Sequence, residues 1–353
     1  MIGYLARRVL MALITIYVVV TISFYMVRFM PGNPVEFLEF KLEQQGNISP
    51  DQIKQQVQAI IGVLPTGPIW KQYLSYVGRI FRGDFGVSML NPSQTVLSVI
   101  GSALPWTILL VGIALLVSFI IGLVIGTIMA AYPDSKFAQI MTGLTSFLSA
   151  IPNYLVAIVL IYLLADQHHF FPITGAYANS TTPGFNASFI GSVLYHAALP
   201  IASYTIVSFG GWALAMKGSV TTVLGADHVR AAESRGLSSR RVTQTYIGRN
   251  AMLPMVTNLA VSVGYMFGGS VFIETYFSYP GLGFRLINAV NSRDYSLMMG
   301  CFLLITIAVV ISNLVVDLIY PIVDPRILRP VNKKTTAVPE PDAELASPEA
   351  MQA

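Results

Sequence analysis

The sequence LPWTILLVGIALLVSFIIGLVIGTIMAAY occupies residues 104–132 and contains no charged side chain. As an α-helix rising about 1.5 Å per residue, this run is longer than the roughly 30 Å thickness of a bilayer's hydrocarbon core. A charge at the bilayer centre costs about 2.5 to 3.5 kcal/mol on insertion scales, so a long uncharged run is typical of a membrane span. We therefore expect this stretch to cross a membrane as a helix.

The composition of the whole chain indicates the same class of protein. Of 353 residues, 21 are Lys or Arg and 17 are Asp or Glu, so that 11% are charged and 54% are hydrophobic. An average soluble domain carries about a quarter charged residues, and one of this size could not bury so much apolar surface. The net charge of +4 is small and dispersed, which argues against a nucleic acid partner. The single cysteine, Cys301, excludes an internal disulfide.

Runs with almost no charge predict an all-α, polytopic membrane protein with six transmembrane helices. The first run follows Arg7 and Arg8, as in a signal peptide, but no small-residue cleavage site comes after it, so we expect a retained anchor. The six predicted spans are residues 9–30, 103–132, 137–165, 191–216, 250–274 and 295–322.

Basic residues predict the orientation of these spans, because cytoplasmic loops are enriched in Lys and Arg. The segment 217–249 carries six basic residues, and the short segments that fall on the other side carry few. We therefore expect both termini on the cytoplasmic side of a cell's cytoplasmic (inner) membrane, with a tail disordered after about residue 331. The predicted cytoplasmic segments are 1–8, 217–249 and 323–353, and the predicted external segments are 31–102, 166–190 and 275–294.

The external segment 31–102 has two amphipathic stretches. Ser49 and Pro50 are typical of a helix start, and apolar residues then recur at helical spacing. A second helix is expected from Trp70 to its end at Gly83, with one apolar face. These helices either lie on the membrane surface and pack on the spans, or form a docking platform for an external partner.

The cytoplasmic segment contains a short predicted helix. Asp227 is expected to cap its start and Gly236 to end it. A helix of about nine residues is not stable alone in water, so it must pack on something. Ser238 is expected to cap a second, basic helix that leads into the fifth span. The segment is either a solvated basic loop that fixes topology, or a rigid knob that fits a groove in another protein.

Catalytic signatures are missing from the sequence. It has no phosphate-binding Gly-x-x-x-x-Gly-Lys-Ser/Thr loop, no Gly-x-Ser-x-Gly and no His-Glu-x-x-His. We therefore expect a non-catalytic chain, with any nucleotide bound by another subunit. Asp166, His168 and His169 are the only candidate metal cluster, and adjacent histidines cannot both face one site on a regular helix, so no metal site is expected. Asp317 near the end of the last span favours an interface or helix-pairing role over a proton relay.

The stretch RAAESRGLSSRRVTQTYIGRNAMLP, residues 230–254, resembles the signature loop of permease subunits of binding-protein-dependent ABC importers. Ala231, Ala232, Gly236 and Pro254 match the general pattern, and Arg230 replaces its Glu, as in the dipeptide/oligopeptide/nickel branch. Further motifs of this branch follow in order along the chain. They include Gly83-Asp84-Phe85-Gly86, Leu104-Pro105-Trp106-Thr107, ETYFSYPGLG at 274–283, and Arg293-Asp294-Tyr295.

The resemblance implies the type I importer permease fold, in which the short cytoplasmic helix is a coupling helix that sits in a groove of the ATPase. Ala231 and Ala232 would then permit close approach, Gly236 would turn the chain, and the arginines would pair with acidic groups of the partner. The residues implied in ATPase coupling are Asp227, Arg230, Ala231, Ala232, Glu233, Arg235, Gly236 and Arg240.

The implied function is that of a transmembrane subunit that imports peptides by alternating access. The implied partners are a homologous second permease, two ATPase domains that bind ATP and Mg²⁺, and an external solute-binding protein, while this chain binds no cofactor itself. Oligosaccharides or nickel remain alternative solutes. From another class, a membrane-embedded hydrolase or a proton-coupled carrier would need polar groups inside the spans, which have almost none. The residues that line the solute pathway cannot be assigned from the sequence.

Overall fold

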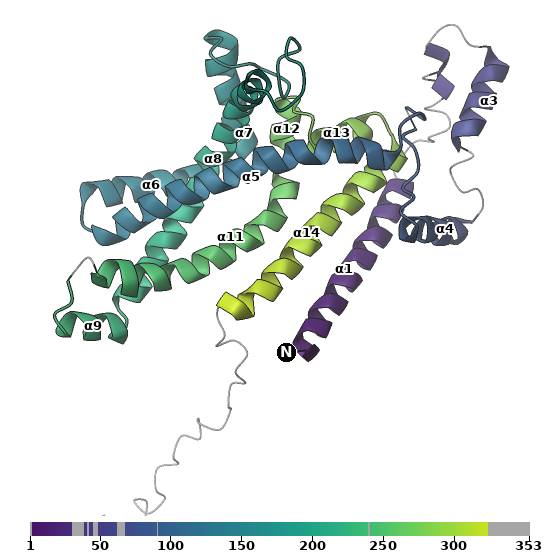
Figure 1. Cartoon of the computed structure of the whole chain (residues 1–353). Coiled ribbons are helices and arrows are strands. Elements are labelled where there is room, and N and C mark those ends of the chain that lie inside the picture. The colour runs from purple at the N-terminus through teal and green to yellow at the C-terminus, as the bar shows by residue number, and fades with distance from the viewer. Residues whose placement is uncertain are drawn as a thin grey trace, which may run out of the picture.

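The computed structural model of the chain describes residues 2–29, 39–40, 42–44, 49–61, 68–89, 91–238 and 241–323. These residues are mostly helical, and their only β-type pairing is an isolated bridge between Val87 and Thr95. Five long helices dominate the arrangement (Figure 1). They are α1 (Ile2–Arg28), α5 (Val96–Ala131), α8 (Ala187–Leu224), α11 (Arg249–Gly269) and α14 (Tyr295–Val323).

Four helices of the described part are long and apolar enough to cross a membrane, or five if one bent pair is counted as a span. The four candidate spans are Ala6–Met26, Val96–Ala131, Ala187–Leu224 and Tyr295–Val315. The predicted fifth span, 250–274, forms α11 and part of α12 (Val271–Tyr276) and is not among these candidates. The described residues thus contain four or five apolar spans, and the number six stays a prediction.

The predicted third span, 137–165, is not one straight helix. It consists of α6 (Lys136–Ala150), α7 (Asn153–Leu160) and the π-helical η1 (Ile161–Gln167), with a bend of 96° at the break. Pro152 stands at the break and has no amide hydrogen to donate. Ile151 takes an extended conformation, as steric pressure from a following proline favours. Pro200, by contrast, lies within a continuous α8.

The closest helix packing in the core joins α5 to α8. A Cβ atom at Gly122 would collide with Trp212 and lie 2.9 Å from the Phe209 carbonyl oxygen. At Gly126 it would lie 2.8 Å from the Cβ of Met216. The two glycines, four residues apart, thus form a small-residue face that lets the backbones of α5 and α8 approach.

The two predicted external helices are present. α3 (Pro50–Ile61) starts with a reciprocal cap, because the Gln52 amide donates to Ser49 Oγ and the Ser49 amide donates to Gln52 Oε1. α4 spans Ile69–Phe81, and Arg82 occupies its C-cap position. The next residue, Gly83, has a φ of +72°, which favours glycine. The Tyr73 hydroxyl of α4 lies 2.7 Å from Thr21 Oγ1, so α4 packs against the end of α1.

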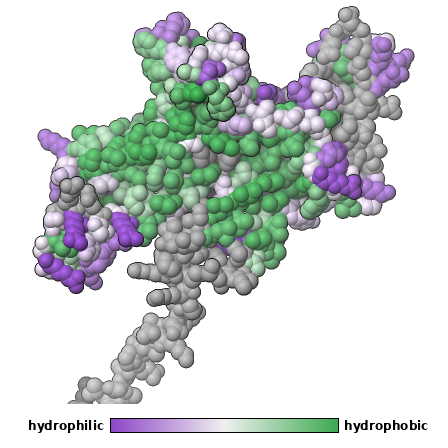
Figure 2. All heavy atoms as spheres, viewed as in Figure 1, coloured by the Kyte–Doolittle hydropathy of each residue, from purple (hydrophilic) through white to green (hydrophobic). Residues whose placement is uncertain are grey.

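The surface of the molecule is apolar over a broad band. Figure 2 shows hydrophobic side chains along the long helices and hydrophilic ones around α9 and at the opposite end near α3 and α4. Leu13, Ile120 and Val124 are each more than half exposed. So much exposed apolar surface is incompatible with water and fits contact with lipid or with other membrane subunits.

The α5–α8 contact generates a prediction about stability. Gly122→Ala should lower stability by about 1–3 kcal/mol, because the added methyl group overpacks the contact with Trp212. Gly101→Ala is the matched control, since it lies on the same helix with open space around its Cβ position and should gain helix propensity. Thermal unfolding in detergent measures both, and equal melting temperatures would contradict the packing account.

Candidate functional site

The predicted coupling helix is α9 (Asp227–Ser234), and it connects α8 to α11. Its N-cap position is held by Ala226, so the expectation that Asp227 caps the helix is corrected: Asp227 lies in the first turn, and no side chain caps the start. A carboxylate there still interacts favourably with the positive end of the helix dipole. The helix occupies a corner of the molecule far from α3 and α4 (Figure 1).

Gly236 ends α9 in the way its sequence position predicts. The Gly236 amide donates to the Glu233 carbonyl at 2.8 Å, and the Leu237 amide donates to the Ala232 carbonyl at 3.4 Å. This pair of bonds is a Schellman motif, which needs a residue with positive φ at the turn. Gly236 supplies it with a φ of +71°.

One face of α9 is buried against other helices of the same chain. Val229 and Ala232 are 1% and 2% exposed and belong to one apolar cluster with Val242, Ile247 and Ala251. The last three residues lie in η2 (Val242–Gly248) and at the start of α11, which follows η2 directly. α9 is therefore packed against η2, the element that leads into α11.

The opposite face of α9 is exposed. Ala231 faces solvent, whereas Ala232 faces η2, so the expectation that both alanines permit approach of a partner is corrected for Ala232. Arg240 lies outside the described residues. The predicted coupling residues that are exposed are Asp227, Arg230, Ala231, Glu233, Arg235 and Gly236.

A cleft separates the end of α9 from the neighbouring ends of α5 and α8. Its volume is about 790 Å³, and its lining includes Glu233, Leu237, Ala131 and Val220. Close to it, Ser219 Oγ donates to the Ala251 carbonyl at 2.8 Å and ties α8 to α11. The region around α9 thus combines a hydrogen bond between α8 and α11 with free volume beside α5.

A second polar site, which sequence reasoning missed, lies at the far end of α5. Glu274 of α12 is fully buried and accepts hydrogen bonds from Thr107 Oγ1 at 2.8 Å and Ser270 Oγ at 3.0 Å. It also accepts from the backbone amides of Gly283 at 2.7 Å and Phe284 at 3.3 Å. These amides open α13 (Leu282–Asn291), so the carboxylate caps that helix.

The two glycines of ETYFSYPGLG, Gly281 and Gly283, allow close packing around this carboxylate and α12. A Cβ atom at Gly281 would collide with the Glu274 carboxylate and lie 2.6 Å from Thr107 Oγ1. At Gly283 it would lie 2.5 Å from the Cα of Val271. The Leu282 amide completes the network by donating to Thr107 Oγ1 at 2.8 Å. The network, here called the Glu274 hub, therefore fixes α12 and α13 to α5.

A second buried carboxylate holds the start of α14. Asp294 accepts a hydrogen bond from the Leu297 amide at 3.1 Å and another from Ser88 Oγ.

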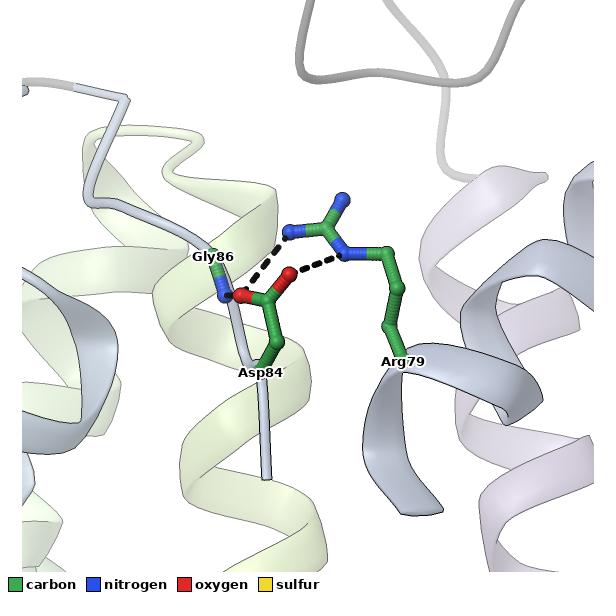
Figure 3. Close-up of polar contacts among 3 residues, drawn as sticks. All are labelled: Arg79, Asp84 and Gly86. Carbon is green, nitrogen blue, oxygen red and sulfur yellow. Dashed lines mark hydrogen bonds and ion pairs between the residues drawn. The ribbon is translucent and has the colours of Figure 1, made fainter. Parts of the chain in front are cut away.

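The turn at residues 83–86, just before Ser88, is held by an ion pair. Asp84 pairs with Arg79 at 2.9 Å and accepts a hydrogen bond from the Gly86 amide (Figure 3). The Arg79 hydrogen bond lowers the pKa of Asp84, and the Gly86 amide lowers it further. The turn is therefore stabilised at neutral pH, and this contribution is lost as the pH falls through that lowered pKa.

Among the described residues, no group of three or more His, Cys, Asp or Glu side chains is placed to hold a metal ion. His168 stacks on Phe170, and His169 Nδ1 lies 3.1 Å from the Ala165 carbonyl oxygen. The candidate residues around Asp166 thus make other contacts.

Comparison with known proteins identifies the family. The family model for the inner membrane component of binding-protein-dependent transport systems matches residues 122–329, which include α9 and most of the Glu274 hub. The chain belongs to this family. Similar proteins include the oligopeptide transport system permease protein OppB of Haemophilus influenzae, 30% identical over 93% of this chain and 99% of the relative. AppB of Bacillus subtilis, also an oligopeptide permease, is 30% identical, and the dipeptide permease DppB of Escherichia coli is 29% identical, each with the same coverage.

The family assignment and the apolar helices together make the chain a multi-pass membrane protein of this transport family. Both polar features described above fall in regions that sequence motifs mark: α9 in the signature loop and Glu274 in ETYFSYPGLG. For Glu274, the signal available in the sequence was a carboxylate at the end of an apolar run, which is costly unless it is bonded.

The Glu274 hub generates a second prediction. Glu274→Leu should destabilise the permease by about 3 kcal/mol, because it leaves buried amide and hydroxyl donors without an acceptor. Glu274→Gln keeps one acceptor oxygen and should therefore lose less stability than Glu274→Leu. Glu233→Gln on the exposed face of α9 is the control and should leave the melting temperature unchanged. Equal stability of the Leu and Gln variants at position 274 would contradict the hydrogen-bonded hub.

Proposed function

We propose that this chain is a transmembrane permease subunit of an ATP-driven importer of peptides. The observation that carries the proposal is the two-sided character of α9. Val229 and Ala232 pack α9 against η2, which leads directly into α11, while its charged face is left exposed. A helix built in this way can receive a force from a partner and pass it to a span.

In the proposed mechanism, α9 sits in a groove of an ATPase subunit that binds ATP and Mg²⁺. Closure of the two ATPases draws the coupling helices together, and the rigid Schellman turn at Gly236 passes the displacement into η2 and α11. The cleft beside Glu233 and Leu237 provides volume for that movement. ATP needs only to bind one conformation of the importer more tightly than the other.

The proposed topology has six spans and two cytoplasmic termini in the cytoplasmic membrane. α11 would be the fifth span, and the bent α6–α7–η1 element the third. The basic residues near α9 support a cytoplasmic location for it, since Lys and Arg are enriched on that side. α3, α4 and the Glu274 hub then lie at the external end of the bundle.

The proposed partners are a homologous second permease, two ATPase domains and an external solute-binding protein. Their support is the family, whose members are inner membrane components of binding-protein-dependent systems, together with exposed apolar faces on the long helices. On the external side, Phe185 and Phe170 are strongly exposed and offer contacts to a binding protein. This chain itself would bind no nucleotide and catalyse no reaction.

Peptides are the proposed solute because the similar proteins are described as oligopeptide and dipeptide permeases. Oligosaccharide or nickel import by the same architecture is the second candidate, and none of the relatives reported above favours it. A membrane-embedded hydrolase or proton-coupled carrier lacks support from any of the described side chains within the apolar spans.

The coupling role is tested at Gly236. Gly236→Val should abolish ATP-driven uptake of peptides into proteoliposomes holding the complete complex, because a β-branched residue resists the positive φ that the turn requires. Gly236→Asn, which tolerates this conformation, is the matched control and should retain most uptake. Normal uptake by the Val variant would contradict the coupling role, and uptake of sugars without peptides would contradict the proposed solute.

A further inference from the structure

A cleft of about 510 Å³ lies between α1 and α14, which pack side by side (Figure 1). Its volume falls within the usual range of ligand sites, about 300 to 1,000 Å³. The residues that line it are Arg7, Arg8, Met11, Ala12, Thr15, Val310, Asn313 and Leu314.

The lining of the cleft is polar near the end of the two candidate spans and apolar further along them. Arg7 and Arg8 lie in the first turn of the candidate span Ala6–Met26, and Asn313 lies in the last turn of the candidate span Tyr295–Val315. These polar groups therefore stand where hydrocarbon meets headgroups. Met11 and Val310 continue the cleft toward the hydrocarbon side.

Two of the polar side chains have hydrogen-bond donors that no described residue accepts from. Neither the Arg7 guanidinium nor the Asn313 carboxamide makes a hydrogen bond or ion pair with the described residues. Thr15, in contrast, already donates to the Met11 carbonyl at 2.9 Å. Besides Arg7 and Arg8, the nearest charged residue in the sequence of these two helices is Asp317, so the region has an excess of positive charge.

We propose that this cleft binds an anionic phospholipid of the inner leaflet, with its phosphate at Arg7 and Asn313 and an acyl chain over Met11 and Val310. A guanidinium presents a planar fork of donors that matches phosphate oxygens. Basic pockets between transmembrane helices on the cytoplasmic side suit anionic headgroups. The assignment to the inner leaflet depends on the proposed topology, and the lipid site does not depend on which solute is carried.

Two other occupants fit the lining less well. A free phosphate ion would satisfy Arg7 but would leave Met11, Val310 and Leu314 uncovered. An apolar helix of a second permease would cover these side chains but would leave the guanidinium without an acceptor at the edge of the hydrocarbon. A phospholipid supplies both an anion for Arg7 and an apolar chain for Met11 and Val310.

The test uses the complete complex with its ATPase and permease partners, and native mass spectrometry in the presence of phosphatidylglycerol or phosphatidylcholine. The wild type should retain phosphatidylglycerol at least about tenfold more strongly than phosphatidylcholine. Arg7→Gln should lose this preference. Ala12→Phe fills the cleft but keeps both arginines, and it should also lose the lipid. Lys136→Gln removes an exposed basic residue on α6, away from the cleft, and should retain the preference.

Three results would overturn the inference. Equal retention of phosphatidylglycerol by the wild type and by both cleft variants would exclude the site. Displacement of the lipid by millimolar inorganic phosphate, without any preference between lipids, would assign the cleft to a free anion. Cross-linking of Ala12→Cys to the second permease in the assembled complex would assign the cleft to a protein interface.

Discussion

Burial of Val229 and Ala232 holds in place an eight-residue helix that is too short to be stable alone. Because these two side chains pack on η2, the remaining face of α9 can meet another protein without the helix unfolding. The Schellman turn at Gly236 then fixes the direction in which the chain leaves the helix. The proposed transmission between an ATPase partner and the spans would depend on this attachment.

The opposite end of the bundle is held by buried carboxylates. Glu274 joins α5, α12 and α13, and Asp294 joins the start of α14 to Ser88. Breaking a buried network of this kind lowers stability, whereas a fully hydrogen-bonded one makes the structure rigid. In the proposed topology, the external end of the bundle would then be rigid, and the cytoplasmic end would carry a helix with one packed and one exposed face.

Local signals predicted much of this structure. Runs without charge predicted α1, α5, α8 and α14, and a glycine in the right place predicted the end of α9. A carboxylate at the end of an apolar run marked Glu274, but its partner Thr107 could not be predicted, because the two residues lie 167 positions apart. The burial of Ala232 rather than Ala231 likewise depends on η2, a neighbour in space. Pro152 stands at the break between α6 and α7, but nothing in the local sequence specifies the bend of 96°.

Site-directed cross-linking to the ATPase subunit tests the central claim most directly. In a Cys301→Ser background, Ala231→Cys and Ala232→Cys are compared, since the first residue is exposed and the second is buried against the chain's own η2. The account predicts that position 231 cross-links to a cysteine in the ATPase groove in a nucleotide-dependent manner, and that position 232 does not. Equal cross-linking at both positions, or none at position 231, would contradict it.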